Sequence, residues 1–198
     1  MKEIIRKILK AIFKVVAIIL YRPKIVGKEN IPQDTSAIIC PNHVHALDSA
    51  VIVAMANRKI NVLAKEELYI NGFVRWVASV FGIYPVKKGK KSLESMKISL
   101  KLLKNNELLM IFPEGTRKGL AKGVKPKNGA IKLAIKAGVP IIPVGVQGDF
   151  KLFRKIKLNI GKPINYASHK EDINNKEILD KLTKGLMDEI VRLRDEKL

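Results

Sequence analysis

The sequence contains one cysteine, Cys40, and few acidic residues: 18 Asp and Glu stand against 38 Lys and Arg. A single cysteine excludes an intramolecular disulfide, and no segment has the pattern of a cleavable secretory signal. These absences indicate an intracellular protein. At 198 residues, with 47% hydrophobic and 28% charged residues, the chain is long enough for one domain with a substantial core.

Aromatic residues are also scarce, at 6% of the chain. Stacking on bases needs aromatic platforms, and the sequence lacks zinc-finger spacing, a basic region with heptads and the aromatic-glycine signature of RNA-binding sheets. The net charge is nevertheless +20, and the first 169 residues carry 31 basic and 10 acidic residues. Such a field attracts anionic partners: phospholipid headgroups, phosphorylated substrates, acidic carrier proteins or nucleic acid. We therefore predict an anionic membrane surface, and no nucleic acid, as the partner of the basic region.

No apolar run is long enough to cross a membrane, because the longest, Val15 to Tyr21, is far shorter than the roughly 20 residues required. Residues 2–21 instead predict one amphipathic helix. One side carries Lys2, Arg6, Lys7, Lys10 and Lys14, and the other carries Ile4, Ile5, Ile8, Leu9, Ile12, Val15, Val16 and Ile19. This pattern is typical of a helix in the membrane interface. The alternative is a helix packed on the core with its lysines in water.

Strand-like and helix-like segments alternate along the rest of the chain. Strand-like runs occupy 24–26, 36–40, 60–64, 107–112, 140–147 and 156–161, and helical patterns occupy 47–57, 92–104, 128–137 and 171–196. A largely apolar segment with Trp76 lies at 68–81. The alternation predicts an α/β fold: a single domain with a mixed, mostly parallel sheet and helices on both faces. We expect residues 1–23 to form the membrane-association helix and 24–198 to form this domain.

Two polar blocks directly follow strand-like runs. The block Asn42–Asp48 follows the run at 36–40, and the block Phe112–Arg117 follows apolar residues 108–111. In an open α/β sheet, the loops at the carboxyl ends of strands carry the catalytic and ligand groups. The two blocks therefore predict one site at one edge of the sheet.

His43 and Asp48 are the candidate base and its orienting carboxylate. Histidine titrates near neutrality, so it can take a proton from an alcohol, and an aspartate can hold its ring in the useful tautomer. Five positions apart on a straight helix, the two side chains would lie about 140° apart. They can meet only if His43 lies in a loop and Asp48 in the first turn of the following helix, and Pro41 favours that break.

Other interpretations of these residues exist. Asp48 can serve only as a helix cap, and His43, His45 and Asp48 can bind zinc. The only further histidine, His169, lies near the C-terminal tail, so a metal site is not favoured, and His45 is interpreted as a packing residue of the loop. A covalent route through Cys40 or Ser49 is also not favoured, because Cys40 lies in an apolar strand and no Gly-x-Ser-x-Gly turn is present.

The blocks resemble those of the glycerolipid acyltransferase family, in particular its bacterial 1-acyl-glycerol-3-phosphate acyltransferases. The family's first block is Asn-His, four intervening residues and Asp, and its third, Phe-Pro-Glu-Gly-Thr-Arg, stands at 112–117 without substitution. Its fourth block resembles Val139–Val144. Its second usually has Gly followed six residues later by Arg, and here Lys88 takes the arginine position after Gly82. The resemblance spans roughly residues 25–165.

The resemblance implies an acyltransferase that moves a fatty acyl group from acyl-CoA or acyl carrier protein to the free hydroxyl of 1-acyl-glycerol 3-phosphate, giving phosphatidic acid. Glycerol 3-phosphate or another lysolipid is the alternative acceptor. The non-enzymatic alternative is a basic membrane- or nucleic-acid-binding module. No metal or prosthetic group is implied, and the thioester is a cosubstrate. The expected location is the cytoplasmic face of the cell membrane, as a peripheral or monotopic protein, with acyl carrier protein as a further partner.

The resemblance also assigns residues to the site. His43 and Asp48 are the expected catalytic residues. A lysine at position 88 supplies charge but not the bidentate geometry of arginine. The expected substrate-binding residues are Asn42, Gly82, Lys88, Glu114, Gly115, Thr116, Arg117, Lys127, Gly129 and Pro140.

Overall fold

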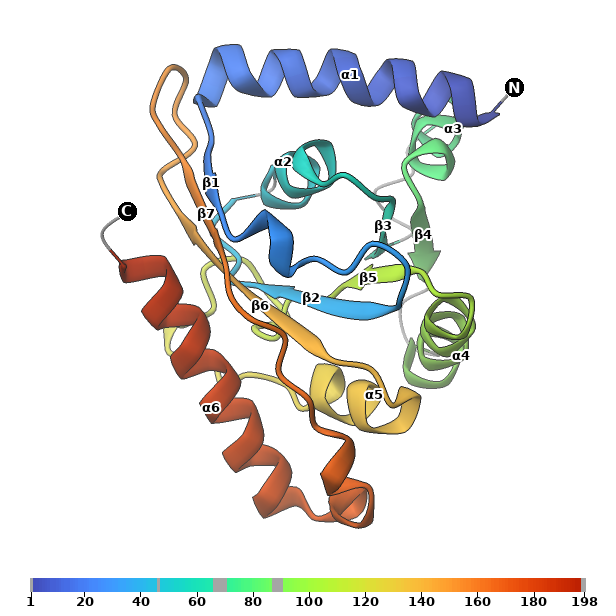
Figure 1. The fold of residues 1–198 in the computed structure, drawn as a ribbon, viewed down its shortest axis with the longest axis vertical. Helices are drawn as coiled ribbons and strands as arrows, with labels where there is room; N and C mark the ends of the chain where they lie inside the picture. Colours follow the sequence, from blue (N-terminus) through green and yellow to red (C-terminus); the bar gives the residue numbers. More distant parts are fainter. Residues whose placement is uncertain (1, 46, 66–70, 87–90, 197–198) are drawn as a thin grey trace.

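The computed structural model describes residues 2–45, 47–65, 71–86 and 91–196. Within them, seven strands form one sheet in the order β1-β7-β6-β2-β5-β3-β4 (Figure 1). The neighbouring pairs are parallel except for β6 and β7, which are antiparallel. The strands are β1 (Lys24–Val26), β2 (Ala37–Pro41), β3 (Ile60–Lys65), β4 (Ile83–Val86), β5 (Leu108–Met110), β6 (Ile141–Gln147) and β7 (Lys157–Ile160).

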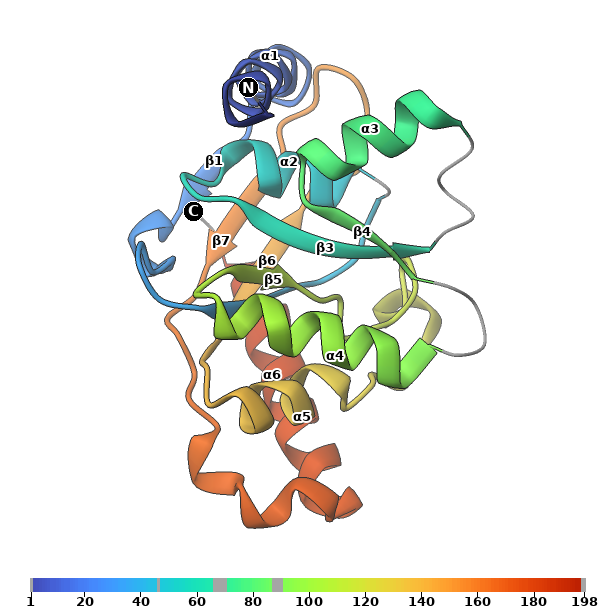
Figure 2. The same ribbon diagram turned by 90° about the vertical axis from the view of Figure 1, so that its right-hand side faces the viewer.

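Helices cover both faces of the sheet. One face is covered by α1 (Lys2–Tyr21) and α2 (Asp48–Met55), with α3 (Gly72–Val80) beside α1 near β4 (Figure 2). The other is covered by α4 (Lys91–Lys104), α5 (Gly129–Ala137) and α6 (Lys176–Asp195). Short 3₁₀ turns are η1 (Lys28–Asn30), η3 (Leu120–Lys122), η4 (Ala167–His169) and η5 (Glu171–Asn174). The predicted α/β fold, with a mixed and mostly parallel sheet, is confirmed.

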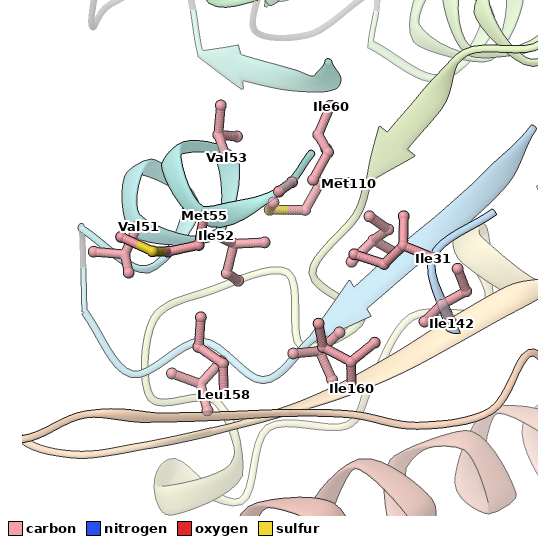
Figure 3. Close-up of a cluster of buried hydrophobic side chains, with 14 of the residues drawn as sticks. Ile31, Val51, Ile52, Val53, Met55, Ile60, Met110, Ile142, Leu158 and Ile160 are labelled. Carbon is pink, nitrogen blue, oxygen red and sulfur yellow. The ribbon is translucent and has the colours of Figure 1, made fainter. Parts of the chain in front are cut away.

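Two apolar layers hold the sheet between its helices, because successive strand residues point to opposite faces. In β2, Ile39 packs toward α2, whereas Ile38 and Cys40 pack toward α5 and α6. Figure 3 shows the first layer, where Ile52 and Met55 of α2 lie over strand residues that include Ile142, Leu158 and Ile160. Each fully buried aliphatic side chain stabilises the fold by about 1.5–3 kcal/mol, so α2 is fixed firmly on the sheet.

The largest differences from the sequence prediction concern three elements, β4, α3 and α6. The strand β4 is not predicted, because it is a short edge strand whose Pro85 interrupts the strand pattern. The helix α3 lies within the apolar segment 68–81, where branched and aromatic residues weaken the helical signal. The closing helix starts at Lys176 and not at 171, because the side chain of Asn175 accepts hydrogen bonds from the backbone N–H groups of Glu177 and Ile178 at 3.1 and 3.2 Å.

The predicted helix over 2–21 coincides with α1, and its aliphatic side faces away from the protein. The exposed fractions of Ile4, Ile8, Ile12, Val15 and Ile19 lie between 55% and 63%. The residues that pack inward include Ala17 and Tyr21. Among the described helices, none combines the length and apolar character needed to span a bilayer.

One of the predicted lipid-facing cations, Lys10, faces inward instead. Its ammonium donates to the backbone carbonyls of Ala56 and Arg58 at 2.5 and 3.3 Å, just past the C-terminal end of α2. A cation is favourable there because the helix dipole is negative at that end. Burial, and then the neighbouring Arg6, lower the pKa of Lys10 below its usual range. Lys10 therefore ties α1 to the helix that begins with Asp48.

Candidate active site

The two polar blocks meet at the carboxyl-terminal edge of the sheet. The strands β2 and β5 are parallel neighbours that end at Pro41 and Met110, so the loops that follow them begin side by side. The backbone N–H of Lys118 donates to the carbonyl of His43 at 2.6 Å, which joins one loop to the other. The predicted site at one edge of the sheet thus has a structural basis.

His43 and Asp48 are in direct contact. The Nδ1 atom of His43 lies 3.0 Å from Oδ2 of Asp48. His43 lies in the loop and Asp48 is the first residue of α2, as the spacing requires. The Asp48 side chain is fully buried, whereas that of His43 is 18% exposed. Because Nδ1 faces the carboxylate, Nε2 is the ring nitrogen left to meet a substrate hydroxyl.

The carboxylate of Asp48 also fixes the backbone of the loop. Its Oδ2 accepts the N–H groups of Val44 and His45 at 2.7 and 2.8 Å. These residues precede α2, whose N-cap residue is Leu47 without a side-chain cap bond, so the helix-cap interpretation of Asp48 is wrong. Charge-assisted bonds of this kind are stronger than neutral ones. Asp48 therefore both fixes the conformation of the loop and orients the imidazole of His43.

Glu114 holds the catalytic loop from the other block. Its side chain is buried, with one oxygen accepting the N–H of His43 and the other accepting the N–H of Leu120, each at 2.7 Å. The ring of His43 also stacks on Phe112, with centroids 4.0 Å apart. Both carboxylate oxygens of Glu114 are thus engaged with backbone groups of the protein. These contacts describe a positioning residue, whereas the substrate contact that the resemblance implies for Glu114 stays a prediction.

Asn42 is likewise bonded within the fold. Its amide donates to the carbonyl of Val146 at 3.0 Å and accepts the N–H of the same residue at 2.6 Å. The side chain is buried and joins the end of β2 to the end of β6. Asn42 therefore anchors the residue before His43, and its expected contact with substrate stays a prediction.

A cationic surface lies beside the base. Gly115 has a φ of +66°, and a Cβ there would lie 3.0 Å from Cε of Lys127, so the Lys127 side chain runs along this turn. The Lys127 N–H bonds the carbonyl of Pro113 at 2.8 Å, which brings Gly129, the first residue of α5, to the same loop. Thr116 and Arg117 are exposed, and within the described ranges no residue pairs with the guanidinium of Arg117. Arginine, lysine and a helix N-terminus all favour anions.

Two other expected site residues, Gly82 and Pro140, lie elsewhere. Gly82 has a φ of +74° in the turn before β4, next to Asn61 at the amino end of β3. The carbonyl of Pro140 accepts the N–H of Ile38 at 3.0 Å, at the amino end of β2. The structure therefore puts Gly82 and Pro140 at the sheet edge opposite His43 and does not bring them to it. Lys88 lies outside the described residues.

The remaining candidates have packing roles. The ring of His45 stacks on Phe150 at 5.3 Å, and its Nδ1 accepts the N–H of Leu47 at 3.3 Å. Cys40 is fully buried, and burial raises the pKa of its thiol far above the usual range. A thiol held neutral in this way is a poor nucleophile. The contact between His45 and Phe150 was not foreseen, because the two residues are far apart in sequence.

We expect Glu114→Gln to lower both stability and turnover. One of the two backbone N–H groups would then face the amide NH₂ instead of an oxygen, and losing such a buried bond costs about 1–3 kcal/mol. Urea denaturation and kcat, measured on the same preparations, check this. The matched control is Glu171→Gln, at an exposed glutamate far from the site. A Glu114→Gln protein with unchanged stability and kcat would contradict the positioning role.

The comparisons agree with this geometry. Residues 22–147, which contain both blocks, match the Acyltransferase family. The 1-acyl-sn-glycerol-3-phosphate acyltransferase of Bacillus subtilis is 31% identical over 87% of this chain and 88% of its own length. The protein of the same name from Borreliella burgdorferi is 31% identical over 73% of this chain and 59% of its own length.

The fold has a counterpart among crystal structures. The 1-acyl-sn-glycerophosphate (LPA) acyltransferase PlsC from Thermotoga maritima superimposes with a TM-score of 0.72, at 23% identity, over 98% of this chain and 83% of that one. This likeness concerns the fold alone. Taken with the sequence match over residues 22–147, it leads to one conclusion: this chain belongs to the acyltransferase family.

Proposed function

We propose that the protein is a 1-acylglycerol-3-phosphate O-acyltransferase, which transfers a fatty acyl group from a thioester to the free hydroxyl of 1-acyl-glycerol 3-phosphate. The observation that carries this proposal is the contact of 3.0 Å between His43 and Asp48, beside the loop that exposes Arg117. The product is phosphatidic acid. Relatives from two bacteria that bear this enzyme's name support the choice of acceptor.

The reaction follows from the position of His43. Nε2 takes the proton of the acceptor hydroxyl while the hydroxyl oxygen attacks the thioester carbonyl carbon. The tetrahedral intermediate then expels the sulfur, the carbon–sulfur bond breaks, and the imidazolium returns the proton to the thiolate. Asp48, paired with Nδ1, stabilises the imidazolium between these steps. The residues of this scheme need no metal or prosthetic group, so we expect turnover to persist in a chelator.

The acceptor phosphate binds two exposed cations, one in the second block and one beside it. Arg117 supplies the bidentate fork, and Lys127, lying along Gly115, adds a second charge. Both donors, acyl-CoA and acyl carrier protein, carry negative charge and fit a chain of net charge +20. Because charge does not distinguish the two donors, an assay with each thioester in turn is needed to identify the one that is used.

An acceptor panel tests the proposed substrate. The purified full chain is supplied with a labelled acyl thioester and with 1-acyl-glycerol 3-phosphate, monoacylglycerol, glycerol 3-phosphate or a lyso-aminolipid. We expect the highest kcat/KM for 1-acyl-glycerol 3-phosphate, because it alone combines the phosphate with an acyl chain and a free hydroxyl. A preference for glycerol 3-phosphate or for the lyso-aminolipid would replace the proposed acceptor.

We further propose that α1 seats the protein on an anionic membrane, at the cytoplasmic face and without crossing it. The support is the exposed aliphatic side of α1, where Ile8, Ile12 and Val15 are each 55% exposed. Apolar area of this size would otherwise stay in water, and the cations Lys7 and Lys14 on the same helix are exposed for headgroup contact. This arrangement matches an interfacial helix better than a helix packed by its aliphatic side on the core.

The triple variant Ile8→Asp, Ile12→Asp, Val15→Asp is expected to leave the membrane. Each substitution replaces an exposed apolar side chain with a charge, so the fold should persist while binding to anionic vesicles falls by more than about tenfold. Vesicle co-sedimentation measures binding, and the matched control replaces the same three residues with leucine. Activity on vesicle lipid should fall far more than activity on a short-chain soluble acceptor. Equal vesicle binding by the Asp and Leu variants would contradict this role of α1.

A further inference from the structure

Residues 148–155, within the loop between β6 and β7, expose two adjacent large apolar side chains. Leu152 and Phe153 are 61% and 63% exposed. A single exposed apolar residue is common in soluble proteins, but an adjacent pair at the tip of a hairpin marks a contact surface. We call residues 148–155 the hairpin tip.

The fold holds the hairpin tip in this shape. Phe150 and Phe153 have φ values of 52° and 62°, a left-handed conformation that bulky residues rarely adopt. Phe150 is buried between the rings of Tyr21 and His45, at centroid distances of 5.7 and 5.3 Å. The N–H of Phe153 donates to the carbonyl of Leu20 at 2.7 Å. The tip is therefore fastened to the last turn of α1 while Leu152 and Phe153 project outward.

The hairpin tip lies beside the C-terminal end of α1, which has an exposed aliphatic side of its own. Figures 1 and 2 both show the tip, in orange, reaching the level of α1. Ile19, in the last turn of α1, is 57% exposed. The hairpin tip and the C-terminal end of α1 are therefore neighbours, and each exposes apolar side chains.

The charges around the tip fit an anionic lipid surface. Lys151, Arg154 and Lys155 are exposed, against one carboxylate, that of Asp149. Asp149 pairs with Lys151 at 3.6 Å. Apolar side chains flanked by an excess of cations are typical of segments that enter the headgroup region of anionic membranes.

We propose that the hairpin tip is a second membrane contact, in which Leu152 and Phe153 enter the headgroup region and the flanking cations meet lipid phosphates. This inference rests on the proposed seating of α1 on the membrane and adds an independent surface to it. A single interfacial helix can roll about its own axis, whereas two separate contacts set one orientation. Because Phe150 stacks on His45, the orientation fixed by the tip is also that of the catalytic loop.

A double variant tests the tip by vesicle binding. Leu152→Ser with Phe153→Asn removes the apolar surface without changing charge, and asparagine tolerates the left-handed backbone at 153. We expect the full chain to lose at least about tenfold in partition onto anionic vesicles. The matched control is Leu93→Ser, at a leucine that is 75% exposed on α4, which covers the opposite face of the sheet. Parent-like binding by the double variant would overturn the proposal.

A fluorescent reporter locates the tip directly. Phe153→Trp in a Trp76→Phe background leaves one tryptophan in the chain. On anionic vesicles its emission should shift to the blue and be quenched by brominated lipid, and emission that stays water-like would overturn the proposal. A double variant that binds vesicles normally could instead lose self-association, or could lose transfer from acyl carrier protein but not from acyl-CoA. Either result would show that the tip binds a protein and that the proposal is wrong.

The binding assay is independent of turnover, which separates this inference from the proposed function. A parent chain that binds vesicles through the tip but transfers no acyl group would refute only the enzyme activity. Conversely, the parent and the double variant could both transfer the acyl group to a short-chain soluble acceptor and bind vesicles equally well. That outcome would refute only the proposed membrane contact of the hairpin tip.

Discussion

Replacing His43 with alanine is expected to lower kcat by about 10²–10⁴-fold, the usual contribution of a positioned general base. This variant removes the imidazole that is paired with Asp48 and that would take the proton from the acceptor hydroxyl. The fold should survive, because the backbone of residue 43 keeps its bonds to Glu114 and Lys118. Steady-state rates, with circular dichroism to verify folding, check this prediction.

Asp48→Asn is the companion variant. It keeps the shape of the side chain but removes the charge that stabilises the imidazolium, so we expect a smaller loss than for His43→Ala and still more than about tenfold. His45→Ala is the matched control, since that ring stacks on Phe150 and does not contact Asp48 through its side chain. If His43→Ala retained the parental kcat, the proposed mechanism would be wrong.

Arg117→Ala is expected to raise the KM for 1-acyl-glycerol 3-phosphate by about 10–100-fold, since a hydrogen bond between charged partners contributes roughly 1.5–3 kcal/mol. The KM for the acyl donor should change much less. Arg117→Lys keeps the charge but loses the bidentate fork, so its KM should lie between those of the parent and the alanine variant.

Two controls make the Arg117 experiment specific. Lys122→Ala removes another exposed cation that lies outside the 112–117 block. Monoacylglycerol, which lacks the phosphate, should be used equally poorly by the parent and by Arg117→Ala. An unchanged acceptor KM in Arg117→Ala would move the phosphate site to other residues.

The sequence predicted those parts of the site whose partners are near in the chain. The pair His43 and Asp48 could be foreseen because a loop and one helical turn bring them together, and the structure has them 3.0 Å apart. The α/β fold followed from the alternation of apolar runs, and α1 from its periodicity over twenty residues. Local patterns of this kind need no knowledge of distant contacts.

The sequence could not predict contacts between residues far apart in the chain. Glu114 reaches the backbone of His43 across 71 positions, and Asn42 reaches Val146 across 104. Both are polar residues within motifs, where a substrate contact and a backbone contact produce the same pattern. The contact of Lys10 with the end of α2 was likewise not predictable. Helical periodicity shows which side of α1 carries the cation but not which residues of another element lie against that side.

The most direct measurement is the formation of phosphatidic acid by the purified full chain, followed by mass spectrometry. An isotopically labelled acyl thioester, as coenzyme A or acyl carrier protein derivative, is mixed with anionic vesicles that contain 1-acyl-glycerol 3-phosphate. We expect labelled phosphatidic acid from the parent with at least one donor, and at most a trace from His43→Ala. No labelled product from the parent with either donor, or equal amounts from the parent and His43→Ala, would contradict acyl transfer by this site.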